Sequence, residues 1–243
     1  MQDISQRSFR NRLLAFLPSN EISLIKEELE YVHLPRGFVI ASAGHDIDYV
    51  YFLSSGVASV VTVSANTKRA ETGILGRDGF APTAAGVGGT VSPHDILMQI
   101  DGDGFRIPAG ALRSAITQYS CFANVLARYL QTLASQIAYT ALCNINSQVD
   151  VRLARWLLMC HDRLDGDEIP LTHEFISSLL SVRRPSVTTA VHVLEGKRMI
   201  RNERGLIIIR DRAGLEEFVG DAYGAPEREF GRLIGPLLGT CYA

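Results

Sequence analysis

Hydrophobic and polar positions change their period twice along the chain. Between residues 32 and 107, short β-branched or aromatic runs are separated by turns of Gly, Ser and Asp. Three of these runs are Tyr49–Leu53, Val57–Val63 and Ile96–Ile100. Nine glycines lie between Gly73 and Gly110, and glycine suits tight turns and bulges better than helices. The pattern predicts a β jelly roll, preceded by two short amphipathic helices within residues 9–30.

After Pro108 the apolar residues follow a helical period, and Arg128 is the only charged residue between Ser114 and Val149. The steps alternate between four and three, which is a heptad seam, although a break near Ser120 would divide it into two helices. We expect this helix to pack against its own copy in a dimer, and the alternative is a helix buried within one subunit. The predicted dimer contacts are Ala123, Leu126, Leu130, Leu133 and Ile137.

The stretch Leu171–Glu195 is typical of two short helices joined by a tight turn. Thr172 is a good N-cap for a first helix over residues 173–180, and Pro185 suits the first turn of a second helix. In that second helix an apolar face formed by Val187, Ala190, Val191 and Leu194 leaves Arg, Ser, Thr and His on the outside. The following residues, 196–210, predict two strands around the Glu203–Gly205 turn, as in the wing of a winged helix.

The outer face of this motif has the chemistry of a DNA-binding surface. Arginine makes bidentate hydrogen bonds to guanine, and hydroxyl groups bond phosphates or bases. The whole chain has a net charge of −2, yet residues 175–212 hold eight basic and three acidic residues. A basic segment in an acidic chain is the electrostatic footprint of nucleic-acid binding. The predicted DNA contacts are Thr172, Arg183, Arg184, Ser186, Thr188, Thr189, His192, Arg201 and Arg204.

With these motifs in order, residues 10–215 resemble the Crp–Fnr family of transcription regulators, most specifically at Val182–Thr189. The resemblance implies an α+β fold with a cyclic-nucleotide-binding-like β jelly roll, a long dimerisation helix and a C-terminal winged helix-turn-helix. The expected divisions are a sensor domain over 1–108, a dimerisation region over 109–146, a DNA-binding domain over 147–215 and a tail over 216–243. The implied function is a homodimeric DNA-binding transcription regulator with residues 184–195 in the major groove.

The sensor domain departs from the family pattern for cyclic nucleotides. Family members pair the cyclic phosphate with an arginine, whereas no Lys or Arg lies between Asp78 and Phe105 here. A buried phosphate without a guanidinium would be a poorly compensated charge, so cyclic AMP is disfavoured. An iron–sulfur cluster is disfavoured too, since no cysteine precedes Cys121. Haem stays open, with His33, His45 and His94 as candidate ligands, and the effector is otherwise unknown.

Two other functions compete with a ligand-controlled regulator. A cupin-like metal enzyme with an accessory helical domain would need paired histidines, and the six histidines include no HxH pair. There is no GxSxG or HExxH motif either, so we expect no catalytic activity and no metal site. The second alternative is a ligand-independent DNA-binding factor. The expected partners are double-stranded DNA with a pseudo-palindromic operator, a second copy of the chain and RNA polymerase, in the cytoplasm and without a membrane.

Overall fold

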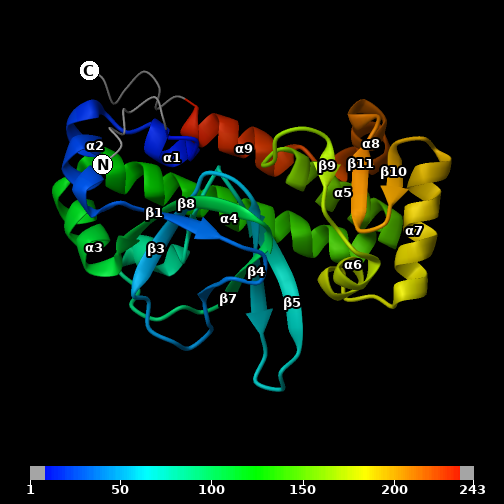
Figure 1. Cartoon of the computed structure of the whole chain (residues 1–243), viewed down its shortest axis with the longest axis horizontal. Coiled ribbons are helices and arrows are strands. Elements are labelled where there is room, and N and C mark those ends of the chain that lie inside the picture. Colours follow the sequence, from blue (N-terminus) through cyan, green and yellow to red (C-terminus); the bar gives the residue numbers. More distant parts are fainter. Residues whose placement is uncertain (1–8, 236–243) are drawn as a thin grey trace.

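A computed structural model describes residues 9–235; the predictions for residues 1–8 and for the tail residues 236–243 lie outside them. Figure 1 shows a β-rich part at one end and a helical part at the other, with a long helix running between them. The chain begins with α1 (Arg12–Ala15), α2 (Ser19–Ile25) and the 3-10 turn η2 (Lys26–Glu28). These match the short amphipathic helices that the sequence predicts.

The β-rich part consists of two four-stranded antiparallel sheets. The first has the order β1-β8-β3-β6 and the second the order β2-β7-β4-β5. Their strands are β1 (Glu30–Leu34), β2 (Val39–Ala41), β3 (Tyr49–Leu53), β4 (Val57–Val63), β5 (Arg69–Leu75), β6 (Phe80–Ala81), β7 (Asp95–Ile100) and β8 (Gly102–Pro108). Two of the predicted runs coincide with β3 and β4, and the third lies within β7. The 3-10 helix η3 (Thr83–Val87) follows β6.

Aromatic side chains fill the space between the first sheet and the long helix. Phe52, Phe80 and Phe122 are each at most 1% exposed, and the ring of Phe52 lies 5.9 Å from that of Phe80 and 6.3 Å from that of Phe122. Burial of apolar surface on this scale is the main force that holds a helix on a sheet. The long helix is thereby fixed to the jelly roll of its own chain.

The predicted break in the helical region is present. Tyr119 has an extended backbone conformation and separates α3 (Ala109–Gln118) from α4 (Ser120–Asn146). The predicted dimer seam, in contrast, needs correction. Leu126 is 0% and Leu133 6% exposed within a single chain, where both belong to the core beneath the jelly roll. Leu130 and Ile137 pack against the same core, and Ala123 is half-buried on the same side.

The opposite face of α4 is the exposed one, and it carries small and uncharged side chains. Its residues also follow alternating steps of three and four: Asn124, Ala127, Gln131, Ala134, Ala138, Ala141 and Ile145. Ile145 is 81% exposed and the neighbouring Leu142 55% exposed. We call the seven residues of this series, from Asn124 to Ile145 and without Leu142, the exposed α4 stripe. The heptad period was therefore present twice, and the more apolar copy packs inside the subunit.

The second half of the chain folds as a winged helix. Its helices are α5 (Val149–His161), α6 (His173–Leu179), α7 (Arg184–Gly196) and α8 (Arg212–Val219). Its small sheet has the order β10-β11-β9, formed by β9 (Glu168–Ile169), β10 (Ile200–Glu203) and β11 (Leu206–Ile209). A core beneath α5 and α7 includes Leu157, Val187 and Val191, each 0% exposed. The predicted wing strands are thus present.

The region after Gly220, predicted as a tail without a clear signal, contains the 3-10 turn η4 (Gly220–Ala222) and α9 (Ala225–Ile234). Figure 1 shows α9 turning back over the molecule along α4. Ile234 joins the jelly-roll core, and Arg128 Nη1 donates to the carbonyl oxygen of Leu233 over 2.8 Å. Helix α9 therefore packs along α4 and covers part of it. Among the described residues, no helix is long and apolar enough to cross a membrane.

Candidate nucleic-acid interface

The sequence between α6 and α7 fixes the angle between these helices. The Thr172 side chain caps α6 by accepting a hydrogen bond from the Phe175 amide over 3.2 Å. After α6, Ser181 adopts a left-handed backbone with φ of 53°, and the Val182 amide donates to the Ser177 carbonyl. A single left-handed residue at the end of a helix stops it and turns the chain. The predicted helix-turn-helix is therefore confirmed element by element.

In α7 the apolar and polar faces lie as predicted. Val187, Ala190, Val191 and Leu194 are at most 3% exposed and pack into the domain core. Pro185 occupies the first turn, where the missing N–H costs no helical hydrogen bond. The helix consequently turns its polar face to solvent along its whole length.

The predicted DNA contacts fall into two groups by exposure. The exposed group consists of Thr172, Arg183, Arg184, Thr189, His192, Arg201 and Arg204. Ser186 and Thr188 are half-buried on the two flanks of α7. Thr188 Oγ1 lies 3.4 Å from His173 Nδ1 on the α6 side. Ser186 and Thr189 instead line a groove shared with Asp150 at the start of α5.

The hydroxyl groups on α7 are partly used by the helix itself. Thr188 Oγ1 donates to the Arg184 carbonyl oxygen over 3.2 Å, and Thr189 Oγ1 donates to the Pro185 carbonyl oxygen over 3.1 Å. In this rotamer each hydroxyl offers an acceptor rather than a donor to a ligand in front of the helix. The free donors on this surface are therefore mainly guanidinium groups.

The arginines of this surface differ in whether a carboxylate already holds them. Within residues 9–235, Arg183, Arg184 and Arg204 form no ion pair. Arg201 pairs with Glu203 over 2.8 Å, with side chains 59% and 40% exposed. Exposed guanidinium groups without a counter-charge are the groups that phosphates and guanine edges bind.

The wing is a short hairpin. Glu203 in β10 is in register with Leu206 in β11, and Gly205 between them has a φ of 75°. A two-residue hairpin loop requires such left-handed backbone, which glycine adopts without strain. Glu195 Oε1 accepts a hydrogen bond from the Asn202 amide over 3.0 Å and so ties the wing to the end of α7. Arg204 is presented at the tip of this hairpin.

One arginine of the basic segment does not belong to this surface. Arg212 Nη2 pairs with Asp162 over 2.8 Å and also donates to the Tyr223 hydroxyl over 2.7 Å. Its Nε pairs with Glu216 over 2.8 Å. Arg212 therefore serves the junction between the winged helix and α9. No sequence pattern indicated this junction, and the period that the exposed α4 stripe shares with the buried face was assigned to the buried face alone.

With this geometry in view, comparison with known proteins identifies the domain. Residues 151–218 match the family model of the Crp-like helix-turn-helix domain. The protein carries a Crp-like helix-turn-helix domain. This finding confirms the predicted resemblance and makes the chain a DNA-binding transcription regulator. No curated protein matches the sequence.

Solved structures extend the likeness to the whole fold of the regulator. FixK2 from Bradyrhizobium japonicum is similar with a TM-score of 0.66 and 15% identity, over 80% of this chain and 99% of its own. TTHB099, a CRP-family transcriptional regulator from Thermus thermophilus, has a TM-score of 0.64 and 18% identity, over 80% and 99%. A CooA mutant from Carboxydothermus hydrogenoformans has a TM-score of 0.62 and 16% identity, over 86% and 95%. At these identities the likeness shows the shared fold, and the predicted fold class is confirmed.

Proposed function

We propose that the regulator acts as a homodimer that places α7 of each copy in the major groove of a pseudo-palindromic operator. The observation that carries this proposal is the outer face of α7 and the wing, where three exposed arginines have no carboxylate partner within residues 9–235. In helix-turn-helix proteins the N-terminal residues of the recognition helix contact base edges. Arg184 stands at that position, so we assign it to base contact.

The neighbouring groups have supporting roles in this proposal. Arg183 occupies the N-cap position of α7 with an extended backbone and no side-chain capping bond, so its guanidinium can reach the phosphates beside the groove. Thr189 and His192 lie one and two turns further along the exposed face. Ser186, Thr188 and Thr172 complete the surface from its edges, and Arg201 and Arg204 approach the backbone from the wing. Phosphate contacts of this kind position a protein without reading sequence.

For the dimer we propose the exposed α4 stripe in place of the predicted seam. Ala127, Ala134, Ala138 and Ala141 are exposed on a helix that carries no charge along this face. Small residues at heptad spacing let two helices approach closely and bury apolar surface against each other. Ile145 and Leu142, exposed at 81% and 55%, would extend the contact toward the winged helices.

A charge-insertion experiment tests this dimer. The double variant Ala134→Arg with Ala138→Arg places four cations in one seam of the proposed dimer, and it should sediment as a monomer with an unchanged helical content. The matched control is Ala65→Arg, an exposed alanine in the turn after β4, which should remain a dimer. A monomeric wild-type protein at micromolar concentration, or a dimeric double variant, would refute the stripe as the interface.

A selection experiment tests the DNA-binding function as a whole. Bound sequences selected from a random DNA pool should converge on an inverted repeat whose half-site centres lie about 34 Å, one helical turn, apart. Footprinting at several salt concentrations should then show protection of both half-sites. Selection of direct repeats or of no consensus would contradict the two-fold arrangement.

We propose that the jelly roll does not bind a cyclic nucleotide. Phe52, Phe80 and Phe122 fill the space between the sheet and α4, and the guanidinium of Arg106 on β8 pairs with Glu30 over 2.7 Å. Haem stays a hypothesis, with His33 and His45 exposed and His94 half-buried. In the described part of the chain, no three or more His, Cys, Asp or Glu side chains lie together so that they could hold a metal ion. Contact with RNA polymerase and a cytoplasmic location remain predictions that follow from transcription control.

A further inference from the structure

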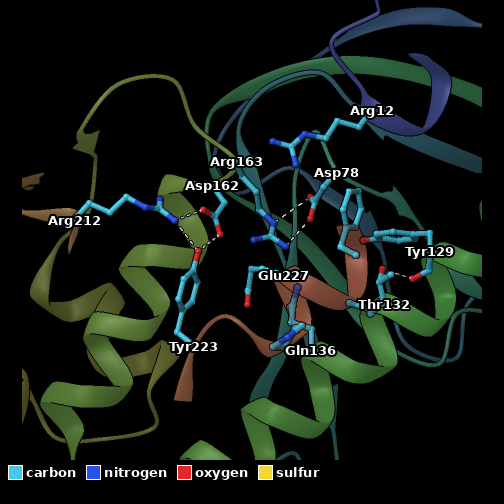
Figure 2. Close-up of a pocket in the computed structure, with 13 residues that line it drawn as sticks. Arg12, Asp78, Tyr129, Thr132, Gln136, Asp162, Arg163, Arg212, Tyr223 and Glu227 are labelled. Atoms are coloured by element: carbon cyan, nitrogen blue, oxygen red, sulfur yellow. Dashed lines mark hydrogen bonds and ion pairs between the residues drawn. The ribbon is translucent and has the colours of Figure 1, made fainter. Parts of the chain in front are cut away.

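A cavity of about 300 Å³ lies where the jelly roll, α4, the winged helix and α9 meet. Figure 2 shows side chains from all four regions converging on it. It borders the aromatic core of the jelly roll through Tyr129, whose ring lies 5.4 Å from that of Phe80, and α9 closes one side of it. A cavity of this size is at the lower end of the range for small-molecule sites.

Part of the cavity wall is a set of charges that already satisfy one another. Arg163 at the end of α5 makes a two-bond pair with Asp78, with Nη2–Oδ2 at 2.6 Å and Nε–Oδ1 at 3.1 Å. Asp162 accepts hydrogen bonds from Arg212 and from the Tyr223 hydroxyl. These contacts join the turn after β5 to the winged helix, and the charges of this part of the wall are already paired within the protein.

Four other groups of the lining have capacity left. The guanidinium of Arg12 has no carboxylate partner within residues 9–235, and its only contact of note there is the Phe230 ring at 5.9 Å. Tyr129 is 2% exposed, and its hydroxyl has no hydrogen-bond partner in that range. Gln136 is 5% exposed and accepts from the Ile74 amide through Oε1, which leaves its amide N–H groups free. Glu227 accepts from the Gly224 amide through Oε2 over 2.9 Å, and further lone pairs of its carboxyl can accept hydrogen bonds.

The position of Tyr129 also depends on a glycine. A Cβ on Gly79 would lie 2.0 Å from the Tyr129 hydroxyl oxygen, so only glycine at this place lets the hydroxyl reach the cavity. Buried polar groups in native proteins almost always have a hydrogen-bond partner from protein, water or ligand. Two residues that are nine-tenths buried and still present unused polar atoms to one cavity therefore point to a polar occupant.

The charge and shape of the lining define that occupant. Three guanidinium groups, from Arg12, Arg163 and Arg212, balance three carboxyl groups, from Asp78, Asp162 and Glu227. A ligand with a net charge would unbalance the set, whereas a zwitterion would not. The unused cation and the unused carboxyl come from α1 and α9, and Figure 2 shows them on different sides of the cavity. Leu133 and Phe230 supply apolar surface between them.

We propose that this cavity is an effector site for a free α-amino acid, with the carboxylate of the ligand on Arg12 and its ammonium group on Glu227. The Tyr129 hydroxyl and the Gln136 amide offer further hydrogen-bond donors to the ligand. Bidentate guanidinium–carboxylate pairing gives the site its orientation. The apolar wall formed by Leu133 and Phe230 receives the side chain, which the volume limits to a small or medium size.

The place of the cavity gives a bound amino acid a regulatory consequence, which rests on the proposed DNA binding. Arg12 belongs to the jelly-roll side, and Glu227 to the helix that follows the winged helix. A ligand that joins these two groups favours one relative position of the two domains. If the amino acid binds one arrangement of the jelly roll and the winged helix more tightly than another, it shifts the population toward that arrangement. In a dimer this shift changes the separation of the two α7 helices.

Thermal unfolding of the whole protein tests the site without any DNA. Each of the twenty protein amino acids is added at about 10 mM, and a ligand of the native state raises the Tm by mass action. We expect at least one amino acid to raise the Tm by several degrees, while acetate, methylamine and glucose at the same concentration do not. No shift with any amino acid, or an equal shift with acetate or methylamine, would overturn the proposal.

Three variants locate the binding. Arg12→Gln and Glu227→Gln should each weaken the binding of that amino acid at least tenfold, whereas the matched control Arg113→Gln, an exposed arginine on α3, should leave it unchanged. Tyr129→Phe removes a hydroxyl without a protein partner, so it should keep the ligand-free Tm and still weaken binding. Amino-acid binding by Arg12→Gln and Glu227→Gln that is as tight as in the wild type would overturn the site. Amino-acid binding that leaves operator affinity unchanged would overturn the regulatory consequence. Amino-acid binding by a protein that binds no operator at all would count against the proposed DNA function and leave the site standing.

Discussion

The winged helix carries two sets of arginines whose surroundings differ completely. On its outer surface Arg184 and Arg204 are exposed and form no ion pair within the described residues. On its inner surface Arg163 is 7% exposed and pairs with Asp78, whose side chain is 11% exposed. An exposed free cation is available to a partner outside the protein, whereas a buried paired cation fixes one part of the protein against another. The inner set therefore serves domain placement, and the outer set is the one that we propose for DNA binding.

The electrostatics of the inner set follow from that pairing. Burial by itself lowers the pKa of the Arg163 guanidinium, but the charges of Asp78 and Asp162 outweigh it and raise that pKa above its ordinary value. A second inner contact joins Glu71 of β5 to Trp156 of α5, whose Nε1 donates to Oε1 over 2.8 Å. Burial raises the pKa of Glu71 to about 8, although hydrogen bonds from Ser59 and Trp156 oppose the shift. The junction thus holds a buried ion pair between Arg163 and Asp78 and a carboxyl, Glu71, whose raised pKa favours the protonated form at neutral pH.

The largest effect is expected from breaking the inner pair. Asp78→Asn leaves the Arg163 guanidinium buried without its ion-pair partner, which should lower the free energy of unfolding by about 3–5 kcal/mol. Urea unfolding measures this change. The matched control is Asp165→Asn, since Asp165 pairs with Arg77 over 2.7 Å at a side chain that is 61% exposed. Solvent screens that pair, so its loss should be far smaller, and equal losses would remove the distinction between inner and exposed pairs.

An effect of comparable size concerns pH. The folded-state pKa of Glu71 lies above its ordinary value of 4.5. Between pH 4.5 and about 8, the folded protein therefore holds a proton that the unfolded chain has already released. Stability should therefore fall as pH rises through this window, by roughly 1.4 kcal/mol per pH unit from this group, and level off above it. Glu71→Gln should flatten the profile and be more stable than the wild type at pH 9. An unchanged slope in the variant would show that Glu71 ionises normally.

On the outer surface, Arg184→Ala should cost about 1–3 kcal/mol per half-site on the operator and relax the preference at one base pair. The reason is the loss of two hydrogen bonds to a guanine edge. Binding to the operator and to a scrambled sequence, measured side by side, separates base contact from phosphate contact. Arg183→Ala is the matched neighbour and should weaken both sequences alike. If Arg184→Ala does the same, Arg184 holds a phosphate and does not read a base.

The two surfaces also differ in how far the sequence predicts them. The outer surface follows from local signals: the Thr172 cap, Pro185 in the first helical turn and an apolar face within one short helix. The inner surface depends on residues such as Asp78 and Arg163 that lie 85 positions apart, and no local spacing reveals such a pair. Local patterns therefore set elements and faces, while the partner of a face is decided by the tertiary fold.

Helices α4 and α9 show the same limit in two ways. In α4 the periodicity correctly marks an apolar face at Leu126 and Leu133, but periodicity is the same whether that face meets a second copy or the sheet of its own chain. In α9, glycine and proline near the start are typical of loops. They act here as a helix start, where the Glu227 carboxylate accepts a hydrogen bond from the Gly224 amide. The cavity, which needs both helices, could not be predicted before the fold was known.

The smallest effect is expected at the wing and compares two arginines three residues apart. Arg204 is free at the hairpin tip, whereas Arg201 is already paired with Glu203 over 2.8 Å. Arg204→Ala should weaken operator and scrambled DNA alike and reduce the slope of log affinity against log salt by about one, since one phosphate contact releases about one counter-ion. Arg201→Ala should reduce that slope by less, because binding DNA must first break the Glu203 pair. Glu203→Gln provides the converse: it frees Arg201 and should steepen the slope. A loss of affinity confined to operator DNA in Arg204→Ala would mean that the wing reads bases. Identical salt slopes in Arg201→Ala and Arg204→Ala would mean that Glu203 does not keep Arg201 from the phosphates in solution.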